Sequence, residues 1–385
     1  MKKITSFNII LVTLNALLLV ALTGVALSPS LPASDYYCVW PPNICKKFFP
    51  ALNVFPGIKQ EAKRFIVNSM GIRGEELSAG YTYKILAIGG STTECAYLDQ
   101  EETWPGLMQS MLNKDQDKFK VWVGNAGKSG FTTRDNIIEM KYLLRQLPQV
   151  DTVILLTGIN DFGLRLMQDT GYDPYFLNKP ENERYSLRRV FCVFPKGRTD
   201  LISPIERTKL WRLKEHVERF FSRNVVDPVG GFNLRNRKKR REASIFRDAL
   251  PDLSSSLEEY ARNLNILIDL ARERSVRVIF MTQPTLWKPE LPKEIEALLW
   301  YGFVGELGRQ KEFYTPQALT AGMMMYNDVL LKVCGERGVE YIDLAAQLPK
   351  NLSVFYDEMH FNENGSCQVA GILSRYILKR EPFKG

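Results

Sequence analysis

The chain has 385 residues, of which 45% are hydrophobic, and carries a formal net charge of +8 at pH 7. This length and apolar content suffice for one large domain or two small ones with a substantial core. The six cysteines include no C-x-x-C pair and the motif H-E-x-x-H is absent, which excludes the common zinc motifs, so we expect no metal and no cofactor.

Residues 1–27 are expected to be a membrane anchor. Lys2 and Lys3 come first, and the remainder of this segment carries no charge. About 20 apolar residues span a bilayer as a helix, so we expect one transmembrane helix with residues 28–385 outside the cytoplasm. Secretion after signal cleavage is the alternative, because Gly24-Val25-Ala26 fits a small-x-small cleavage site. Either topology disfavours a nucleic-acid partner.

Residues 28–56 are rich in proline and show no periodicity, so we expect a linker that leads to a folded domain over residues 57–385. This linker contains Cys38 and Cys45 in the stretch CVWPPNIC. These two thiols could close a small disulfide loop in an oxidising compartment, whereas the other four cysteines are scattered and cannot be paired from the sequence.

Strand-like and helix-like segments alternate along the folded domain. Strands are expected where short β-branched apolar runs occur, at residues 83–88, 120–125, 151–157, 276–282 and 339–344. Helices are expected where apolar residues recur with helical spacing, at residues 103–113, 133–147, 256–274, 318–337 and 364–380. Strands that are apolar on both faces and separated by helices predict a parallel sheet between two layers of helices. Ligands of such sheets bind beyond the carboxyl ends of the strands.

Two segments, residues 184–247 and 284–316, interrupt this alternation and are expected to be insertions on the loop side of the sheet. The first is strongly basic, because residues 184–241 hold 17 Lys and Arg against 5 Asp and Glu, a net charge of +12. It could face anionic lipid headgroups or an acidic glycan, or it could be a solvated insertion that is partly disordered at RNRKKRRE. The sequence leaves both interpretations open.

The chain has only two histidines. His216 lies in an amphipathic basic stretch without a partner carboxylate and is expected at the surface. His360 lies in FYDEMHFNENGS, three residues after Asp357 and just before the last expected helix. One turn can direct both side chains to the same side, so Asp357 could orient the imidazole as in a catalytic triad. A histidine that caps a polar turn is the alternative for this site.

Three expected strands end in residues that are suited to acyl transfer. The first strand runs into Gly89-Gly90-Ser91, where the serine is either a nucleophile or a hydroxyl that fills a glycine-rich turn. The second is followed by GNAGKSGFTT, which is not a phosphate loop, because that motif requires a glycine where Trp122 stands. The third is followed by Asn160. A glycine N–H and a side-chain amide at one sheet edge are the parts of an oxyanion hole.

In this order, these segments resemble the SGNH (GDSL-type) hydrolase family over most of residues 68–380. AIGGSTTECAYL is similar to block I of that family, with Ser91 in the nucleophile position. VGNAGKSGFTT is similar to block II, in which Gly130 matches the glycine whose N–H joins the oxyanion hole. LLTGINDF is similar to block III, with Asn160 as the side-chain donor, and the N–H of Ser91 completes the implied oxyanion hole.

The last conserved segment of the family completes the resemblance. YDEMHF is similar to block V, so Asp357 and His360 are implied to complete a triad with the serine. The lead-in VNSMGIRGEEL, residues 67–77, is similar to bacterial members that have Gly-Gly-Ser in block I. One departure is that Gly90 stands where the family's eponymous aspartate precedes the serine, which weakens any inference about the substrate.

The resemblance implies a three-layer α/β/α, flavodoxin-like SGNH-hydrolase fold and a serine esterase that works through an acyl-enzyme. With the exported topology, it suggests removal of O-acetyl groups from a cell-envelope or exported polysaccharide. Three alternatives stay open: an O-acyltransferase that uses a sugar hydroxyl, a lysophospholipase or thioesterase with an acyl groove over residues 286–303, and an anchored binding protein on an inactive hydrolase fold. The sequence does not indicate an oligomeric state.

Overall fold

The computed structural model describes residues 36–51, 53–147, 149–195, 198, 201 and 229–384. The expected anchor over residues 1–27 and His216 lie outside these ranges. Among the helices of the described ranges, none combines the length and the apolar character that a membrane crossing requires. Almost all described residues belong to one compact unit, formed by Tyr37–Val193 and Pro228–Gly385.

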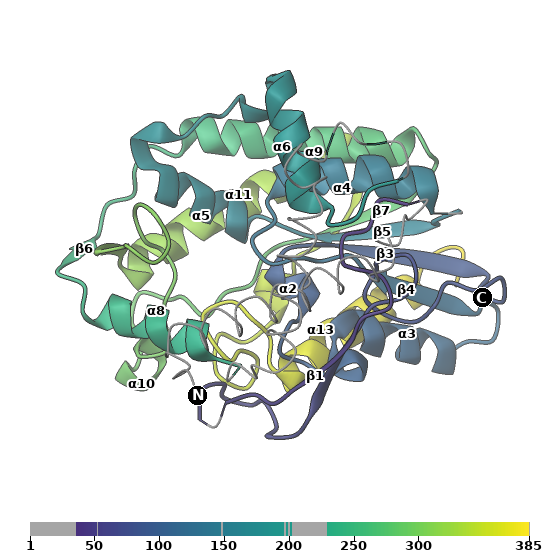
Figure 1. The fold of residues 1–385 in the computed structure, drawn as a ribbon, viewed down its shortest axis with the longest axis horizontal. Helices are drawn as coiled ribbons and strands as arrows, with labels where there is room; N and C mark the ends of the chain where they lie inside the picture. The colour runs from purple at the N-terminus through teal and green to yellow at the C-terminus, as the bar shows by residue number, and fades with distance from the viewer. Residues whose placement is uncertain are drawn as a thin grey trace, which may run out of the picture. The chain divides into compact units, whose positions relative to one another are not determined.

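A five-stranded sheet lies at the centre of this unit, and every neighbouring pair of its strands is parallel (Figure 1). Its strands in spatial order are β4 (Val121–Asn125), β3 (Tyr83–Gly89), β5 (Thr152–Leu156), β7 (Arg277–Met281) and β9 (Glu340–Ile342). In chain order this is 2-1-3-4-5, the flavodoxin-like arrangement, whose order reverses between β3 and β5. The sheet confirms the predicted α/β class with a central parallel sheet.

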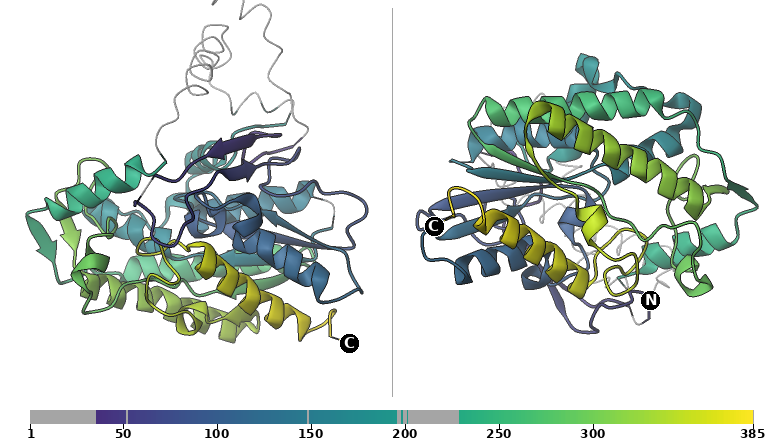
Figure 2. Two further views of the ribbon diagram at one scale, coloured as in Figure 1. Left: turned by 90° about the horizontal axis from the view of Figure 1, so that it is seen from below. Right: turned by 180° about the vertical axis from the view of Figure 1, so that it is seen from behind.

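Helices cover both faces of the sheet (Figures 1 and 2). One face carries α3 (Trp104–Lys114) and α13 (Glu363–Leu378), which pack against each other. The other face carries α4 (Thr133–Gln146), α5 (Ile159–Gln168), α9 (Ser254–Arg272) and α11 (Pro316–Arg337). All five predicted strands and all five predicted helices are therefore present, with ends shifted by one or two residues.

Shorter elements surround these layers. The remaining strands are β1 (Cys45–Phe48), β2 (Lys63–Ile66), β6 (Ile245–Arg247) and β8 (Glu312–Tyr314). The remaining α-helices are α2 (Ser91–Glu94), α6 (Pro180–Val190), α8 (Gly231–Arg241), α10 (Lys293–Glu296) and α12 (Leu344–Gln347). Single 3-10 turns lie at Gln100–Glu102, Asp169–Gly171 and Phe176–Asn178.

The structure differs from the expected linker over residues 28–56. From Tyr37 onward this stretch belongs to the compact unit, where Cys38 is buried and β1 pairs with β2 in an antiparallel register. Cys45 is exposed on β1 and is not joined to Cys38, so the expected disulfide loop is not present in this part of the chain. Proline content and the lack of periodicity led to the linker prediction, and they gave no sign of the strand pairing.

The basic segment also differs from the sequence prediction at RNRKKRRE, where partial disorder was one expectation. These residues form most of α8, and two of their guanidinium groups are buried. Arg237 donates to the carbonyl oxygens of Leu298 and Val54, and Arg240 donates to that of Tyr301. Part of this charge therefore satisfies main-chain acceptors inside the fold instead of facing solvent.

The segment 284–316, expected to be a loop-side insertion, is also packed. Its apolar residues Leu286, Trp287, Leu299 and Phe303 are almost fully buried. Because these side chains already fill the core, they do not form the open acyl groove that the lipid-ester alternative predicted over residues 286–303.

Candidate active site

Ser91 stands at the carboxyl end of the central strand. β3 ends at Gly89, and Ser91 is the first residue of α2, so its side chain lies next to the point where the strand order reverses. A Cβ atom at Gly90 would lie 2.4 Å from Nδ2 of Asn160. A residue larger than glycine at position 90 would therefore require the Asn160 amide to move in this structure.

His360 and Asp357 approach Ser91 from the loop before α13. The Ser91 hydroxyl lies 2.7 Å from Nε2 of His360, and Nδ1 of His360 lies 2.8 Å from Oδ2 of Asp357. The backbone N–H groups of Met359 and His360 donate to Oδ1 of Asp357 at 3.0 and 2.9 Å. Asn362 caps α13 by accepting from the N–H of Gly365, which fixes the end of this loop.

The electrostatics of this pair suit proton transfer. Burial lowers the pKa of His360, but the charge of Asp357 and its hydrogen bond outweigh burial and hold the pKa above the ordinary 6.5. Burial likewise opposes ionisation of Asp357, yet the facing imidazolium and the hydrogen bonds lower the pKa of this carboxyl to about 2. Asp357 is therefore ionised at neutral pH and stabilises a proton on His360.

The loop after β4 and the start of α5 lie together beside Ser91. Asn160, the second residue of α5, donates from Nδ2 to the carbonyl oxygen of Phe131 at 2.8 Å. Gly130 has φ +78°, a left-handed conformation that favours glycine, and within the described ranges no residue accepts from its N–H. Arg189 fixes this peptide by donating from Nη2 to the Gly130 carbonyl at 2.6 Å.

Three N–H donors on these segments keep unused hydrogen-bonding capacity among the described residues. The N–H of Ser91 has no acceptor inside α2, because it belongs to the first residue of that helix. The second N–H of the Asn160 amide remains available after its bond to Phe131. Together with the N–H of Gly130, these are the donors that the resemblance assigns to an oxyanion hole.

Glu94 is a contributor to this site that the sequence analysis missed. Its buried carboxylate accepts from the backbone N–H of Ser129 at 2.6 Å and from the Ser129 hydroxyl at 2.5 Å. Burial raises the pKa of Glu94, and the bonds from Ser129 oppose that rise. Because Glu94 ends α2 and Ser129 precedes Gly130, this contact joins α2 to the loop that contains Gly130.

Arg73 forms hydrogen bonds with carbonyl groups at the end of α2 and in the turn that follows it. Its guanidinium is fully buried and donates to the carbonyl oxygens of Glu94, Cys95 and Leu98, the last two at 2.9 Å. Burial lowers the pKa of Arg73 to about 10, so the group stays charged at neutral pH. The lead-in motif that contributed to the family resemblance therefore has a structural role, because it satisfies the carbonyls at the end of α2.

A cluster of three carboxylates lies apart from the triad. Glu61, Glu102 and Glu363 place their oxygens within 4.8 Å of one another. The buried ammonium of Lys63 lies among them, 3.2, 2.7 and 2.6 Å from the three carboxylates. The Lys63 ammonium therefore already occupies the position between the carboxylates. Its ion pairs join β2 to the start of α13.

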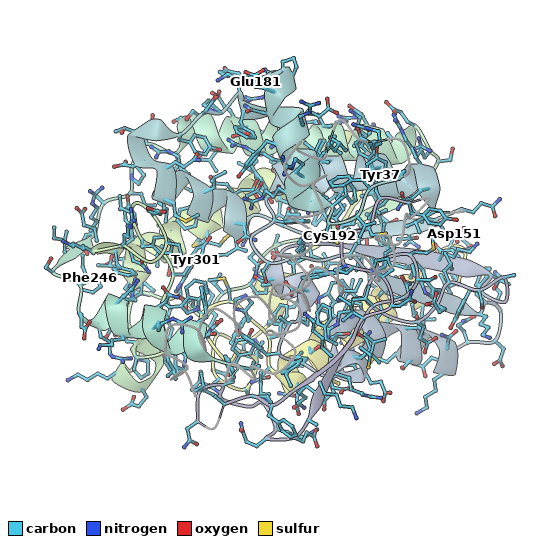
Figure 3. The ribbon with its side chains drawn as sticks, viewed as in Figure 1. Tyr37, Asp151, Glu181, Cys192, Phe246 and Tyr301 are labelled. Carbon is cyan, nitrogen blue, oxygen red and sulfur yellow. The ribbon has the colours of Figure 1, made fainter. Side chains whose placement is uncertain are left out.

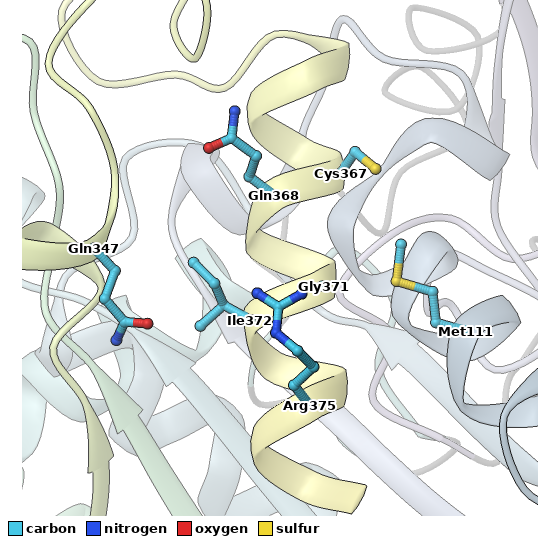
Figure 4. A pocket seen from close by; sticks show the side chains of 7 residues that line it. All are labelled: Met111, Gln347, Cys367, Gln368, Gly371, Ile372 and Arg375. Atoms are coloured by element: carbon cyan, nitrogen blue, oxygen red, sulfur yellow. The ribbon is translucent and has the colours of Figure 1, made fainter.

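Figure 4 shows a cavity of about 500 Å³ along α13. Its lining residues are Met111, Gln347, Cys367, Gln368, Gly371, Ile372 and Arg375. None of the triad residues lines this cavity, and it contains no pairing of a nucleophile with a base. This cavity is therefore separate from the candidate site at the end of β3.

Comparison with known proteins identifies the family of the chain. The sequence profile of the GDSL-like lipase/acylhydrolase family matches residues 87–366. No curated protein matches the chain.

Solved structures with a similar fold include an α/β hydrolase from the metagenome of Lake Arreo, at 16% identity and a TM-score of 0.41, with 78% of this chain and 97% of that one covered. A variant of an acetyl xylan esterase from Geobacillus stearothermophilus is 16% identical with a TM-score of 0.40. The match covers 80% of this chain and 97% of the esterase. The esterase EstA from Pseudoalteromonas sp. is 13% identical with a TM-score of 0.39. The match covers 77% of this chain and 97% of EstA. Because the family profile spans most of the folded unit, the chain belongs to the GDSL-like lipase/acylhydrolase family and is a hydrolase of carboxylic esters.

Proposed function

We propose that this protein is a serine esterase in which Ser91 is the nucleophile, His360 the general base and Asp357 the residue that orients the imidazole. The observation that carries this proposal is the unbroken chain of short contacts from the Ser91 hydroxyl through His360 to Asp357. A hydroxyl, an imidazole and a buried carboxylate in this sequence of hydrogen bonds can form and resolve an acyl-enzyme.

The reaction then follows from the positions of the atoms. Nε2 of His360 takes the proton of the Ser91 hydroxyl while Oγ attacks the ester carbonyl carbon. The N–H groups of Ser91 and Gly130 and the Asn160 amide stabilise the resulting oxyanion. His360 gives its proton to the departing alcohol oxygen as the carbon–oxygen bond breaks, and it then activates a water that releases the carboxylic acid from Ser91.

We propose a short acyl group, acetyl, on a carbohydrate. The buried residues of the segment 284–316 leave no open apolar groove within that segment, which supports a small acyl group. Phe232, 36% exposed, lies edge-on to Trp300 with ring centroids 5.2 Å apart, and the ring of Trp300 is parallel to that of His360. An exposed aromatic ring this close to the triad supports binding of a sugar ring.

We further propose that the enzyme works outside the cytoplasm, because Lys2 and Lys3 precede an uncharged apolar segment of membrane-spanning length. Its substrate would then be a cell-envelope or exported polysaccharide.

A series of p-nitrophenyl esters tests the acyl group, and an O-acetylated polysaccharide tests the acceptor. We expect kcat/KM to be highest for acetate and to fall with each added pair of carbons, and we expect acetate to be released from the polysaccharide. Activity that rises up to the octanoyl ester would contradict the acetyl assignment and favour a lipid ester. Transfer of acetyl to an added sugar without release of acetate would show an acyltransferase instead.

The pH dependence of the reaction follows from the pKa of His360. Only the neutral imidazole can accept the serine proton, and Asp357 holds the pKa of His360 above 6.5. We therefore expect kcat/KM to fall as the pH decreases through this raised pKa, so that the midpoint of the acid limb lies above pH 6.5. The measurement is the pH profile of kcat/KM on an uncharged acetyl ester. Full activity maintained down to pH 6 would be inconsistent with the assigned base.

A further inference from the structure

The segment between β7 and α11 contacts the acid side of the triad through Trp300, which lies in a loop after α10. The indole N–H donates to Oδ2 of Asp357 at 3.1 Å. Its ring stacks on the His360 ring with an interplanar angle of 2° and centroids 6.4 Å apart. Trp300 therefore fixes both the carboxylate and the plane of the imidazole.

The next residue contacts the oxyanion side. The hydroxyl of Tyr301 donates to the carbonyl oxygen of Ile159 at 3.0 Å, directly before Asn160. The ring fits tightly against α5, because a Cβ atom at Gly163 would lie 1.6 Å from the Tyr301 oxygen. The Tyr301 side chain is buried, and in the view of Figure 3 its label lies between α5 and α8. Two adjacent residues thus connect the two halves of the active site.

Glu358, which follows Asp357 in the chain, forms hydrogen bonds with the backbone of both Trp300 and Tyr301. Its Oε1 accepts from the backbone N–H of Trp300 at 2.8 Å and from that of Tyr301 at 2.5 Å. Its own carbonyl accepts from the N–H of Leu286 at 2.8 Å. The side chain is fully buried, and its Oε2 has no hydrogen-bond partner among the described residues.

We propose that Glu358 is a positioning residue of this esterase, which holds Trp300 against the triad and Tyr301 against the start of α5. The inference rests on the proposed function of Ser91, Asp357 and His360. Loss of the Glu358 carboxylate would release both N–H groups into a buried site, so that the indole and the phenol would lose their fixed positions. Placement errors of about 1 Å are enough to slow an enzyme about 100-fold.

The charge of Glu358 also affects the pKa of His360, an effect that packing alone would not produce. His360 is surrounded by the carboxylates of Asp357, Glu358 and Glu94, each of which favours the imidazolium. The cation that faces Glu358 is Arg240, whose guanidinium donates to main-chain carbonyls. Burial and the charge of Asp357 raise the pKa of Glu358 to about 7, so that ionised Glu358 acts on His360 from neutral pH upward.

Three variants test the proposal on the full-length protein, with kcat, KM and the rate of fluorophosphonate labelling of Ser91 as readouts. We expect Glu358→Ala to lower kcat about 100-fold with KM unchanged, because Glu358 does not touch the substrate. We expect Trp300→Phe to lower kcat about tenfold. In the double variant the loss should not exceed that of Glu358→Ala, since Glu358 acts through Trp300.

Glu358→Gln separates positioning from packing. The amide oxygen can still accept from both N–H groups, so kcat should recover, whereas the missing charge should move the acid limb of kcat/KM to lower pH. Exposed Glu306 on the same segment serves as the control. Glu306→Gln should change neither kcat nor the acid limb of kcat/KM. A folded Glu358→Ala protein with wild-type kcat, or a Glu358→Gln protein with an unmoved acid limb, would overturn the inference. Failure of the wild-type protein to label at all would instead overturn the proposed function.

Discussion

Replacing Ser91 with alanine is expected to lower kcat by roughly a millionfold, the effect of removing the nucleophile of a serine hydrolase. The three oxyanion donors and the substrate-binding surface remain in the variant, so a residual rate above that of water should persist. The measurement is acetate release under single-turnover conditions, with the protein concentration high enough to detect the slow reaction.

Ser78→Ala is the matched control, because Ser78 is exposed and precedes the start of β3, whereas Ser91 follows its end. It should retain the full rate. If Ser91→Ala kept more than a tenth of the wild-type rate while folded, the hydroxyl of Ser91 could not be the group that attacks the ester.

Replacing Arg73 with methionine is expected to lower the free energy of unfolding by about 3–5 kcal/mol. Methionine cannot donate, so the Leu98 carbonyl would lose its donor in the interior, and the carbonyls of Glu94 and Cys95 and the Gln100 side chain would each lose a hydrogen bond. Removal of a buried charge offsets part of this loss, but four lost hydrogen bonds to a charged group at about 1.5–3 kcal/mol each outweigh it. Esterase activity should fall as well, because these carbonyls close the helix that begins at Ser91.

Urea unfolding followed by tryptophan fluorescence measures this effect. Arg309→Met is the control, since the Arg309 side chain is 83% exposed and forms a surface ion pair with Glu306. It should change the free energy of unfolding by less than about 0.5 kcal/mol. Equal unfolding midpoints for the two variants would show that the buried guanidinium does not support α2.

The sheet could be predicted from the sequence because its strands are buried on both faces. Such strands appear as short apolar runs, and the helices between them show helical spacing, so the five runs and the five periodic segments correspond to the observed elements. Parallel strands place their carboxyl ends at one edge, which is why Ser91, Gly130 and Asn160 could be brought together without knowledge of contacts.

Other contributors to the site could not be predicted, for physical reasons. Trp300 and Tyr301 lie on an irregular segment without periodicity, and their positions depend on Glu358, whose importance comes from burial and not from a motif. The arginines of α8 were ambiguous for a similar reason. Their sequence shows positive charge, whereas only the packed structure shows that Arg237 and Arg240 donate to main-chain carbonyls.

Covalent labelling with a fluorophosphonate tests the central claim most directly, because it requires an activated serine and no knowledge of the substrate. The full-length protein is incubated with the reagent, and the modified peptide is located by mass spectrometry. We predict one label per chain on Ser91, at a rate that falls when His360 is replaced by glutamine. Labelling at another residue, or a folded protein that takes up no label, would contradict the assignment of Ser91 as the nucleophile.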